Sequence, residues 1–353
     1  MTADFQPVPT DLLGREEPKP SSTDAVLSVQ DLCVRFPTDD GLVHAVEHMS
    51  FDLHANETLG IVGESGSGKS VTSMAILGLL PKTAEITGSI RFRGTEILGL
   101  PEHELRPYRG QKIAMIFQDA LTALNPVYTV GKQIAESIEV HNGKLSRHEL
   151  HDRSVALLEL VGIPNPTQRF DQYPHEYSGG MRQRAMIAMM IANEPDVLIA
   201  DEPTTALDVT IQAQVLDVIE RIQDRMNSSI MLITHDLGVV AGVAERVMVM
   251  YAGRQVETGP VDEIFYKSRH PYTQGLLASL PRLDNQAGGE KLYRIKGQPP
   301  SLIFLPPGCA FNPRCPHALA GTCDTVVPSL EIVEPGHRSS CLRRDEIPVG
   351  VPA

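Results

Sequence analysis

The chain has 353 residues, of which 42% are hydrophobic, so it can form two domains or one large domain with an appendage. Its formal net charge of −13 argues against broad nucleic-acid binding by charge alone, although a local basic patch is compatible with it. No apolar run approaches the roughly 20 residues of a membrane-spanning helix, and the first residues lack the apolar core of a signal peptide. We therefore expect a cytosolic protein that reaches any membrane through partners.

The first part of the chain predicts a tail followed by antiparallel strands. Residues 1 to about 25 are rich in Pro, Ser, Thr and charge, as is typical of mobile segments. Apolar and polar residues then alternate, which predicts strands at 27–29, 32–36, 43–46 and 49–53, with a turn at 39–41. Cys33, far in sequence from the other cysteines, is expected in the core.

A glycine-rich segment follows the apolar run Thr58–Val62, which predicts a buried strand. The segment reads Gly63-Glu64-Ser65-Gly66-Ser67-Gly68-Lys69-Ser70. A helical pattern follows, with Val71, Met74, Ala75 and Leu79 on one face. Strand, glycine-rich turn and helix form the context of a phosphate-binding loop, because glycines let backbone N–H groups face the phosphate and the helix N-terminus adds its dipole. Lys69 is predicted to reach the β- and γ-phosphates and Ser70 to bind Mg²⁺.

The middle of the chain predicts alternating helices and buried strands. Strand patterns occur at 88–92, 112–118, 197–201, 230–234 and 246–251. Residues from about 129 to 178 look mainly helical. A long amphipathic helix follows the strand at 197–201, and its apolar stripe predicts a core face: Ile211, Val215, Val218, Ile219 and Ile222. Such alternation predicts a largely parallel sheet.

Polar residues stand where several of these strands end. Asp201 is placed to hold Mg²⁺ and Glu202 to act as general base, unless the two acids merely open a turn before Pro203. His235 and Gln118 end other strands and are candidates for contact with the γ-phosphate, water or Mg²⁺, although a lone strand-end His is more often structural.

A second glycine pair opens another helix. Ser178, Gly179 and Gly180 offer a hydroxyl and free N–H groups that can bind a phosphate, and the alternative is an ordinary N-cap.

The composition changes from about residue 262, where Pro, Gly and Cys rise and periodicity weakens. Four of the five cysteines lie here: Cys309, Cys315, Cys323 and Cys341. A reducing cytosol favours metal over disulfides for such a cluster. No CxxC pair is present, which weakens a zinc ribbon, whereas four thiolates can hold an iron–sulfur cluster. Zinc, disulfides and free thiols remain alternatives. His317 and His337 are possible further zinc ligands, but we expect them to be ordinary surface residues.

In order, these motifs resemble the ATPase subunit of ABC transporters over about residues 26–262. The matching features are the Walker A loop at 63–70, the Q-loop at Gln118, the signature at 177–181, Walker B at 197–202, the D-loop at 206–208 and the switch histidine at His235. The resemblance implies ATP and Mg²⁺ as ligands, with Ser70, Gln118 and Asp201 on Mg²⁺. It also implies that Phe36 stacks on adenine, and that Ser178, Gly179, Gly180 and Asp208 contribute to ATP sites.

The match departs from the family pattern at two places. Tyr177 and Met181 replace the ends of the Leu-Ser-Gly-Gly-Gln signature, while its phosphate-facing core is intact. Ala120 stands where the Q-loop commonly has a proline, which affects the local turn and leaves the amide of Gln118 in place.

Further segments are similar to the oligopeptide/dipeptide importer branch, and the cysteine tail to its D-type subunit. These segments are 177–184, 201–210, 270–273 and the region from Pro307 to Cys341. The branch implies a [4Fe–4S] cluster on the four cysteines. It also implies partners: a second related ATPase in a heterodimer, two transmembrane permease subunits and an extracytoplasmic substrate-binding protein, with the chain on the cytoplasmic side of the membrane. Residues from Gln118 to about Thr129 would contact the permease.

We therefore predict an α/β fold of the P-loop NTPase, ABC type, with a mixed sheet, an antiparallel β region and a helical subdomain at about 129–180. The expected units are a tail at 1–25, the ATPase domain at 26–262 and a small irregular domain at 263–353. The expected function is ATP hydrolysis that powers peptide import. Alternatives are import of nickel or glutathione-like solutes, a soluble ATPase acting on nucleic acid or ribosomes, and an iron–sulfur redox protein that uses ATP.

Overall fold

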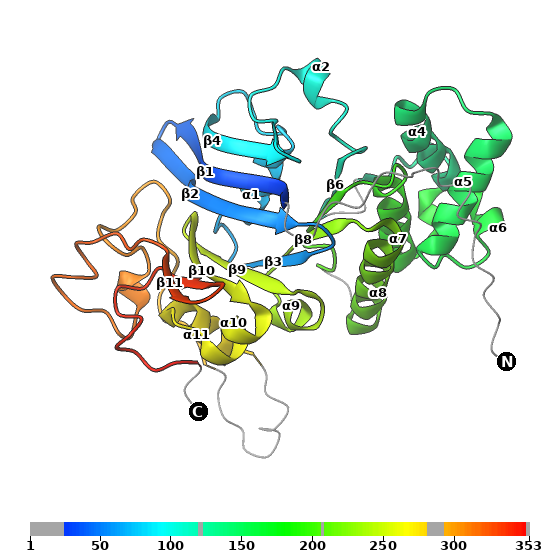
Figure 1. The fold of residues 1–353 in the computed structure, drawn as a ribbon. Coiled ribbons are helices and arrows are strands. Elements are labelled where there is room, and N and C mark those ends of the chain that lie inside the picture. Colours follow the sequence, from blue (N-terminus) through cyan, green and yellow to red (C-terminus); the bar gives the residue numbers. More distant parts are fainter. Residues whose placement is uncertain (1–24, 119–122, 206–207, 281–292, 351–353) are drawn as a thin grey trace, which may run out of the picture.

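A computed structural model describes residues 25–118, 123–205, 208–280 and 293–350, so nearly all of the predicted N-terminal tail lies outside the described residues. A mixed central sheet carries the helical part of the chain at one end and the C-terminal segment at the other (Figure 1). A separate antiparallel sheet lies beside it. This arrangement confirms the predicted mixed sheet, antiparallel region and helical subdomain.

The antiparallel sheet has the strand order β2-β1-β4-β5. Its strands are β1 (Ala25–Thr38), β2 (Gly41–His54), β4 (Glu85–Phe92) and β5 (Thr95–Glu96). The β1–β2 hairpin closes where Thr38 pairs with Gly41, which is the turn that the sequence predicts. The four short strands expected at the start of the chain are therefore two long, bulged ones.

The central sheet has the order β11-β12-β10-β9-β3-β8-β7-β6. Its strands are β3 (Thr58–Val62), β6 (Ile113–Ile116), β7 (Val197–Asp201), β8 (Ser229–Thr234), β9 (Arg246–Tyr251), β10 (Arg254–Pro260), β11 (Glu331–Glu334) and β12 (His337–Ser339). Strands β9, β3, β8, β7 and β6 run parallel to one another. Their carboxyl ends therefore meet at one edge, where sites in such sheets form.

Helices flank this sheet and build the predicted helical region. They are α1 (Lys69–Ile76), α2 (Glu102–Leu105), α4 (Val130–Asn142), α5 (Arg147–Leu160), α6 (Pro166–Phe170), α7 (Gly179–Met190), α8 (Val209–Met226), α9 (Leu237–Val243), α10 (Val261–Lys267) and α11 (Pro271–Ala278), with 3₁₀ turns at Pro174–Glu176 and Asn312–Arg314. None of the described helices is long and apolar enough to cross a membrane.

Helix α1 is shorter than the sequence pattern predicts. It ends at Ile76, and Gly78 turns the chain with φ +59°, a left-handed conformation that commonly stops a helix. Leu79, expected on the buried face, is therefore 44% exposed.

Alternating side chains of the central strands fill two cores. In β7, Leu198 and Ala200 pack with the helical region, while Val197 and Ile199 pack against the antiparallel sheet. Helix α8 buries most of its predicted stripe, from Val215 to Ile222, in the first of these cores. The strands are thus covered on both faces, as their uninterrupted apolar sequences predict.

The C-terminal segment joins the sheet of the ATPase part. Strand β12 pairs antiparallel with β10 through Glu257 and Ser339, and β11 extends the edge. Phe311 of this segment packs in a third core with Tyr251 and Tyr272. The predicted boundary near residue 262 therefore separates two segments that share a sheet and a core.

Candidate functional site

The glycine-rich segment forms a loop between β3 and α1, as predicted. Gly68 precedes the helix with φ +100°, and a Cβ there would lie 2.4 Å from the carbonyl oxygen of Ala45. No other residue type fits that combination of left-handed backbone and close contact. Gly66 also has a positive φ, but the space around it is open. The loop therefore needs glycine at these positions for different reasons.

Lys69 lies inside the loop with its side chain buried. Its ammonium donates to the carbonyl oxygens of Gly63 at 2.7 Å and Glu64 at 3.0 Å. Burial lowers the pKa of Lys69, while the carboxylates of Glu202, Asp201 and Glu64 act in the opposite direction. The lysine therefore lies within electrostatic reach of the predicted metal ligand Asp201 and the predicted general base Glu202.

Asp201 ends β7 beside the start of α1 and is 5% exposed. Burial raises the pKa of its carboxyl group, and a hydrogen bond with Ser70 partly opposes that shift. Its Oδ1 atom is buried without a hydrogen-bond partner among the described residues. A buried, unpaired carboxylate oxygen is costly unless a cation or donor reaches it, so Asp201 and Ser70 fit the predicted Mg²⁺ site.

Glu202 is the point where the predicted site residues converge. Gln118 donates from Nε2 to Glu202 Oε2 at 2.9 Å, and His235 Nδ1 lies 3.4 Å from Glu202 Oε1. Gln118 follows β6, Glu202 follows β7 and His235 follows β8, so neighbouring parallel strands bring the three together. This arrangement shows that the three strand-end residues share one site.

The structure adds one residue that the sequence analysis missed. The hydroxyl of Thr205 donates to Glu202 Oε2 at 2.8 Å. Glu202 itself has φ +48°, and its backbone N–H donates to Ile233 of the neighbouring strand at 2.8 Å. A left-handed non-glycine residue is sparsely populated, and functional sites are among the places where such residues occur. The Thr-Thr pair after Pro203 was a usable signal, because a turn hydroxyl commonly bonds a carboxylate close to it in sequence.

Other predicted ATP residues lie outside this cluster. Ser178 caps α7 by accepting from the N–H of Met181 at 3.3 Å, and Gly179 beside it is exposed. Asp208 caps α8 by accepting from Ile211 at 3.0 Å, while the preceding D-loop residues 206 and 207 lie outside the described part. Figure 1 draws α7 well apart from α1 and the phosphate loop. The signature and the loop of one chain are thus separate surfaces.

Phe36 is half-buried in β1 and packs against the core below the antiparallel sheet. A partly exposed aromatic ring at this position is compatible with stacking on a base and with a core role.

The four C-terminal cysteines line one cavity, together with His270, Pro271, Phe311, His317 and other neighbours. All four thiols are partly buried and unpaired. Burial raises the pKa of Cys309, of Cys315 to about 11 and of Cys341 to about 12, and proximity of the other thiols adds to each shift. The structure thus brings together residues that span 309–341 of the sequence.

Backbone N–H groups face these sulfur atoms. Leu319 donates to the Sγ of Cys323 at 3.4 Å. The N–H groups of Phe311 and Asn312 lower the pKa of Cys309, and that of His317 lowers the pKa of Cys315, which partly offsets burial. Thiols that converge among such donors are suited to ligate a metal centre as thiolates. His317 lines the same cavity. The expectation that His337 is a surface residue is wrong, because it is fully buried and pairs with Glu257 at 3.0 Å where β12 meets β10.

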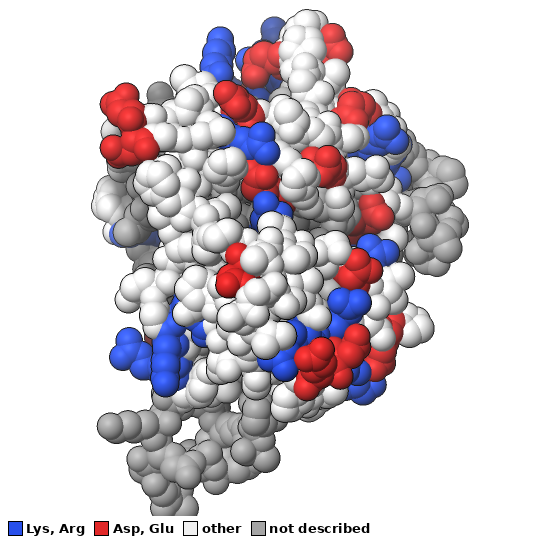
Figure 2. All heavy atoms as spheres, turned by 90° about the vertical axis from the view of Figure 1, so that its left-hand side faces the viewer, with Lys and Arg blue, Asp and Glu red and all other residues white. Residues whose placement is uncertain are grey.

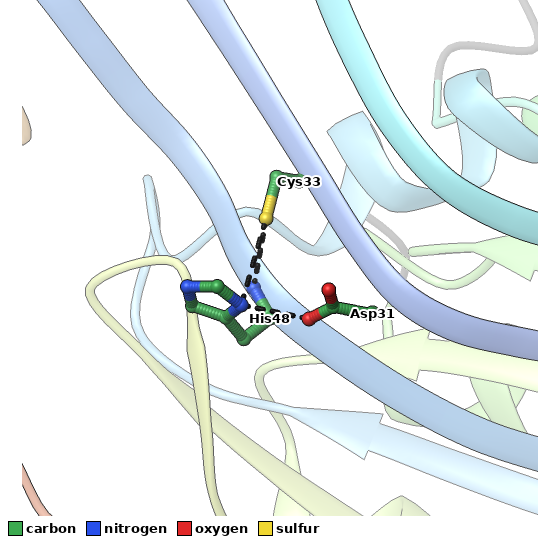
Figure 3. Close-up of side chains that lie close together, drawn as sticks. All are labelled: Asp31, Cys33 and His48. Atoms are coloured by element: carbon green, nitrogen blue, oxygen red, sulfur yellow. Dashed lines mark hydrogen bonds and ion pairs between the residues drawn. The ribbon is translucent and has the colours of Figure 1, made fainter.

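One further group of possible ligands was not anticipated. Asp31, Cys33 and His48 offer ligand atoms within 4.8 Å of one another on the β1–β2 hairpin (Figure 3). His48 Nδ1 bonds the Asp31 carboxylate at 2.7 Å, and Cys33 Sγ accepts the His48 backbone N–H at 3.3 Å. These contacts pair the polar groups of the cluster internally. Cys33 is buried, as predicted for a core residue.

Two family models match the chain. One, described as "ABC transporter", covers residues 46–205, and the other, described as "Oligopeptide/dipeptide transporter, C-terminal region", covers residues 256–323. The first spans the phosphate loop, Gln118, the signature and Glu202. The second begins in β10 and includes three of the four clustered cysteines.

Named relatives extend the similarity over nearly the whole chain. The dipeptide transport ATP-binding protein DppD of Bacillus subtilis is 53% identical over 91% of this chain and 95% of its own length. The oligopeptide transport ATP-binding protein OppD of Mycobacterium tuberculosis is 51% identical over 91% of this chain, which spans about half, 52%, of that longer protein. A bacterial ABC transporter cassette, solved as a dimer, superposes with a TM-score of 0.60 at 24% identity, covering 67% of this chain and 98% of its own, which shows the shared fold.

Proposed function

The chain belongs to the ABC transporter family, and from that membership we propose that it is the ATP-hydrolysing subunit of a peptide importer. The observation that carries this proposal is the convergence of Gln118, Thr205 and His235 on Glu202, within electrostatic reach of Lys69. An acid held at the carboxyl ends of parallel strands beside a phosphate loop is suited to activate water for attack on a phosphate. We infer a peptide cargo because the relatives are named oligopeptide and dipeptide transport proteins.

The phosphate loop binds ATP in this proposal. The N–H groups at the start of α1 and the ammonium of Lys69 face the β- and γ-phosphates, and Lys69 exchanges its bonds to the loop carbonyls for bonds to phosphate oxygens. The aromatic ring of Phe36 provides a stacking surface for adenine.

Ser70, Asp201 and Gln118 would hold Mg²⁺, which when bound neutralises charge on the phosphates. The buried, unpaired Oδ1 of Asp201 supports this assignment, because this oxygen needs a partner and the same carboxyl group hydrogen-bonds Ser70. Asp201 thereby aligns the metal site with the first turn of α1.

Glu202 acts as the general base. Gln118 and Thr205 both donate to Oε2, which fixes the carboxylate plane, and His235 faces Oε1. A carboxylate oriented in this way can accept a proton from an attacking water, while the largely exposed His235 contacts the γ-phosphate side of the site.

We propose that the site is completed by a second, related ATPase subunit. Ser178 and Gly179 are exposed at the N-terminus of α7. Figure 1 draws this helix apart from α1, which follows the phosphate loop. A helix N-terminus with free N–H groups is suited to bind the γ-phosphate held by a partner subunit. Asp208, which the family resemblance also assigns to an ATP site, caps α8.

The membrane partners would contact the surface that follows Gln118. Phe117 is 39% exposed, and Val127 and Tyr128 are 69% and 54% exposed. Exposed large apolar side chains next to a catalytic amide are suited to receive a partner segment and to report its movement to Gln118. Residues 119–122 between them lie outside the described part. This contact would hold the chain at the cytoplasmic face of the membrane, beside two permease subunits supplied with cargo by a binding protein.

The four C-terminal cysteines are proposed to hold a [4Fe–4S] cluster with a structural or regulatory role. Four sulfurs around one zinc, at Zn–S bonds of about 2.3 Å, lie about 3.8 Å apart. Among the described His, Cys, Asp and Glu residues, only Asp31, Cys33 and His48 form a group of three whose ligand atoms lie within 4.8 Å of one another. No three of the four thiols come that close together, and the proposed cluster rests on the four cysteines that line one cavity.

Anaerobic purification tests the cluster directly. We expect a brown protein with broad absorption near about 400 nm and bound iron. A colourless protein that contains zinc would overturn this part of the proposal.

Reconstitution tests the transport function. The chain is assembled in proteoliposomes with its permease subunits, the second ATPase and the binding protein, and ATP hydrolysis is measured with peptides, Ni²⁺ or glutathione added. We expect stimulation by peptides. Stimulation by Ni²⁺ or glutathione instead would replace the cargo and keep the ATPase role, and failure of the complex to hydrolyse ATP would overturn that role.

A nucleic-acid-directed ATPase is the alternative from another class. On the face that carries the C-terminal segment, Lys and Arg side chains alternate with Asp and Glu (Figure 2). Such mixing, with the net charge of −13, supports a protein partner over a phosphate backbone.

A further inference from the structure

Glu64, the second residue of the phosphate loop, is held by an arginine 250 residues further along the chain. Arg314 Nη1 lies 2.6 Å from Glu64 Oε2, and Arg314 Nη2 lies 3.0 Å from Glu64 Oε1. The side chains are 5% and 27% exposed, respectively. A bidentate pair with this geometry and burial is stronger and more directional than a surface ion pair.

The guanidinium is itself fixed on its other sides. Arg314 Nε donates to the carbonyl oxygen of Lys296 at 3.0 Å, and Nη1 also reaches the hydroxyl of Tyr251 at 3.3 Å. The guanidinium carbon Cζ of Arg314 lies 5.7 Å from the centre of the Tyr251 ring. These contacts hold the Arg314 guanidinium in place independently of Glu64.

A second contact holds the backbone of the same loop residue. The N–H of Glu64 donates to the hydroxyl of Tyr272 at 2.8 Å. Tyr272 is fully buried, and its ring centre lies 4.6 Å from that of Tyr251 and 5.4 Å from that of Phe311. The carbonyl oxygen of Glu64 accepts from Lys69. The C-terminal part of the chain thus holds both the side chain and the backbone of a residue that contacts the phosphate-binding lysine.

We propose that Arg314 is a positioning residue for the phosphate loop, through which the C-terminal segment sets the affinity of the loop for ATP. Arg314 lies in the short turn between Cys309 and Cys315, so the conformation around the cysteine cavity decides where the guanidinium points. Arginine keeps its charge at every accessible pH, so the guanidinium side of this contact is constant and its geometry decides the link. This inference rests on the proposed binding of ATP.

Equilibrium binding of a fluorescent ATP analogue to the full-length chain tests the proposal. We expect Arg314→Gln to raise the dissociation constant about ten- to a hundredfold, since small displacements of positioning groups have effects of that order. Arg314→Lys keeps the charge and loses the forked geometry of the guanidinium. Its dissociation constant should lie between that of the unaltered chain and that of Arg314→Gln. Glu64→Gln breaks the contact from the other side, and the double variant Glu64→Gln/Arg314→Gln should be no weaker than the worse single variant.

Arg338→Gln is the matched control, because Arg338 is an exposed arginine of the same segment on β12. It should bind the analogue as the unaltered chain does. The assembled complex adds a second readout: KM for ATP should rise in Arg314→Gln while kcat stays within about twofold, which a general loss of folding would not produce. Unchanged affinity in folded Arg314→Gln and Glu64→Gln, or additive effects in the double variant, would overturn the inference. Failure of the unaltered chain to bind the analogue would instead overturn the proposed function.

Discussion

The side chains at the ends of the parallel strands have different roles in the proposed chemistry. Asp201 is buried and lies beside Ser70, whereas Glu202 is turned by its left-handed backbone toward Gln118, Thr205 and His235. Two adjacent acids thereby face different partners. Successive side chains of a strand point to opposite sides, and the positive φ of Glu202 adds a local turn of the backbone.

Replacing Glu202 by Gln tests the base. We expect hydrolysis by the assembled complex to fall about 10²- to 10⁴-fold, because an amide cannot accept the proton of the attacking water, while ATP still binds. Steady-state phosphate release and binding of a fluorescent ATP analogue measure the two effects. Glu220→Gln, on the exposed side of α8, is the control and should keep normal turnover. Normal turnover of Glu202→Gln would remove Glu202 from the base role.

Glu47 offers a test through pH. Burial alone would raise the pKa of its carboxyl group, but hydrogen bonds from Arg35 and His44, both at 2.7 Å, lower it to about 2 from an ordinary 4.5. A depressed pKa in the folded state stabilises the fold above about pH 4.5, and this contribution is lost as the pH falls toward 2. The shift corresponds to about 3 kcal/mol.

We therefore expect Glu47→Gln to lower the free energy of unfolding at pH 7, and the gap to the unaltered chain to shrink as the pH falls from 4.5 toward 2. Urea unfolding at pH 7, 4 and 3 measures the gap. Glu139→Gln, at an exposed position of α4, should show little effect at any pH. A gap that is independent of pH would show that charge on Glu47 is not what stabilises the hairpin.

At the scale of elements, the β3–loop–α1 unit depends on the strands around it. The loop packs under β2, since a Cβ on Gly68 would meet the carbonyl of Ala45, and Val46 lies beside it. Sequence motifs predict which residues face the phosphate, but this neighbour comes from the antiparallel sheet.

A pair of glycine substitutions separates backbone conformation from packing. Gly66→Ala adds a Cβ at φ +78° in open space, and we expect it to cost about 1 kcal/mol of stability. Gly68→Ala meets the Ala45 carbonyl at 2.4 Å as well, so we expect a clearly larger loss and weakened ATP binding. Thermal unfolding of the nucleotide-free chain compares them. Equal stabilities would indicate that the backbone of β2 moves aside.

At the scale of the whole molecule, the separation of α7 from the phosphate loop predicts a site shared between subunits. A Cβ on Gly179 would meet no atom within 4 Å, so Gly179→Asp should fold normally and bind ATP with unchanged affinity. In the assembled complex the new carboxylate would face the partner's γ-phosphate, so we expect hydrolysis to be lost through repulsion.

The control for this prediction is Gly242→Asp, because Gly242 of α9 is also a helical glycine with open space around it. Hydrolysis should be retained in Gly242→Asp and lost in Gly179→Asp, measured in the same complex. If Gly179→Asp hydrolyses ATP normally, the signature does not complete a partner's site.

The sequence by itself predicted the fold class, the loop Gly63–Ser70 and the strand-end residues Gln118, Asp201, Glu202 and His235. These features are local: periodicity sets strands and helices, and a phosphate loop needs its glycines, lysine and serine in consecutive positions. Parallel strands then place their carboxyl ends at one edge, so even the grouping of these residues follows from the pattern. The length of α1 was less predictable, since the left-handed turn at Gly78 overrides the apolar spacing that continues to Leu79.

Only the tertiary structure decided what holds these parts in place. Three contacts could not be predicted from sequence patterns. They are the hydrogen bond of Thr205 to Glu202, the pairing of the β11–β12 hairpin with β10, and the ion pair of Arg314 with Glu64. The reason is physical, because a hydrogen bond or an ion pair depends on where two side chains meet in space. Glu64 and Arg314 are in contact although 250 residues separate them along the chain. The phosphate loop was readable from consecutive residues, whereas its support from the C-terminal segment required the folded molecule.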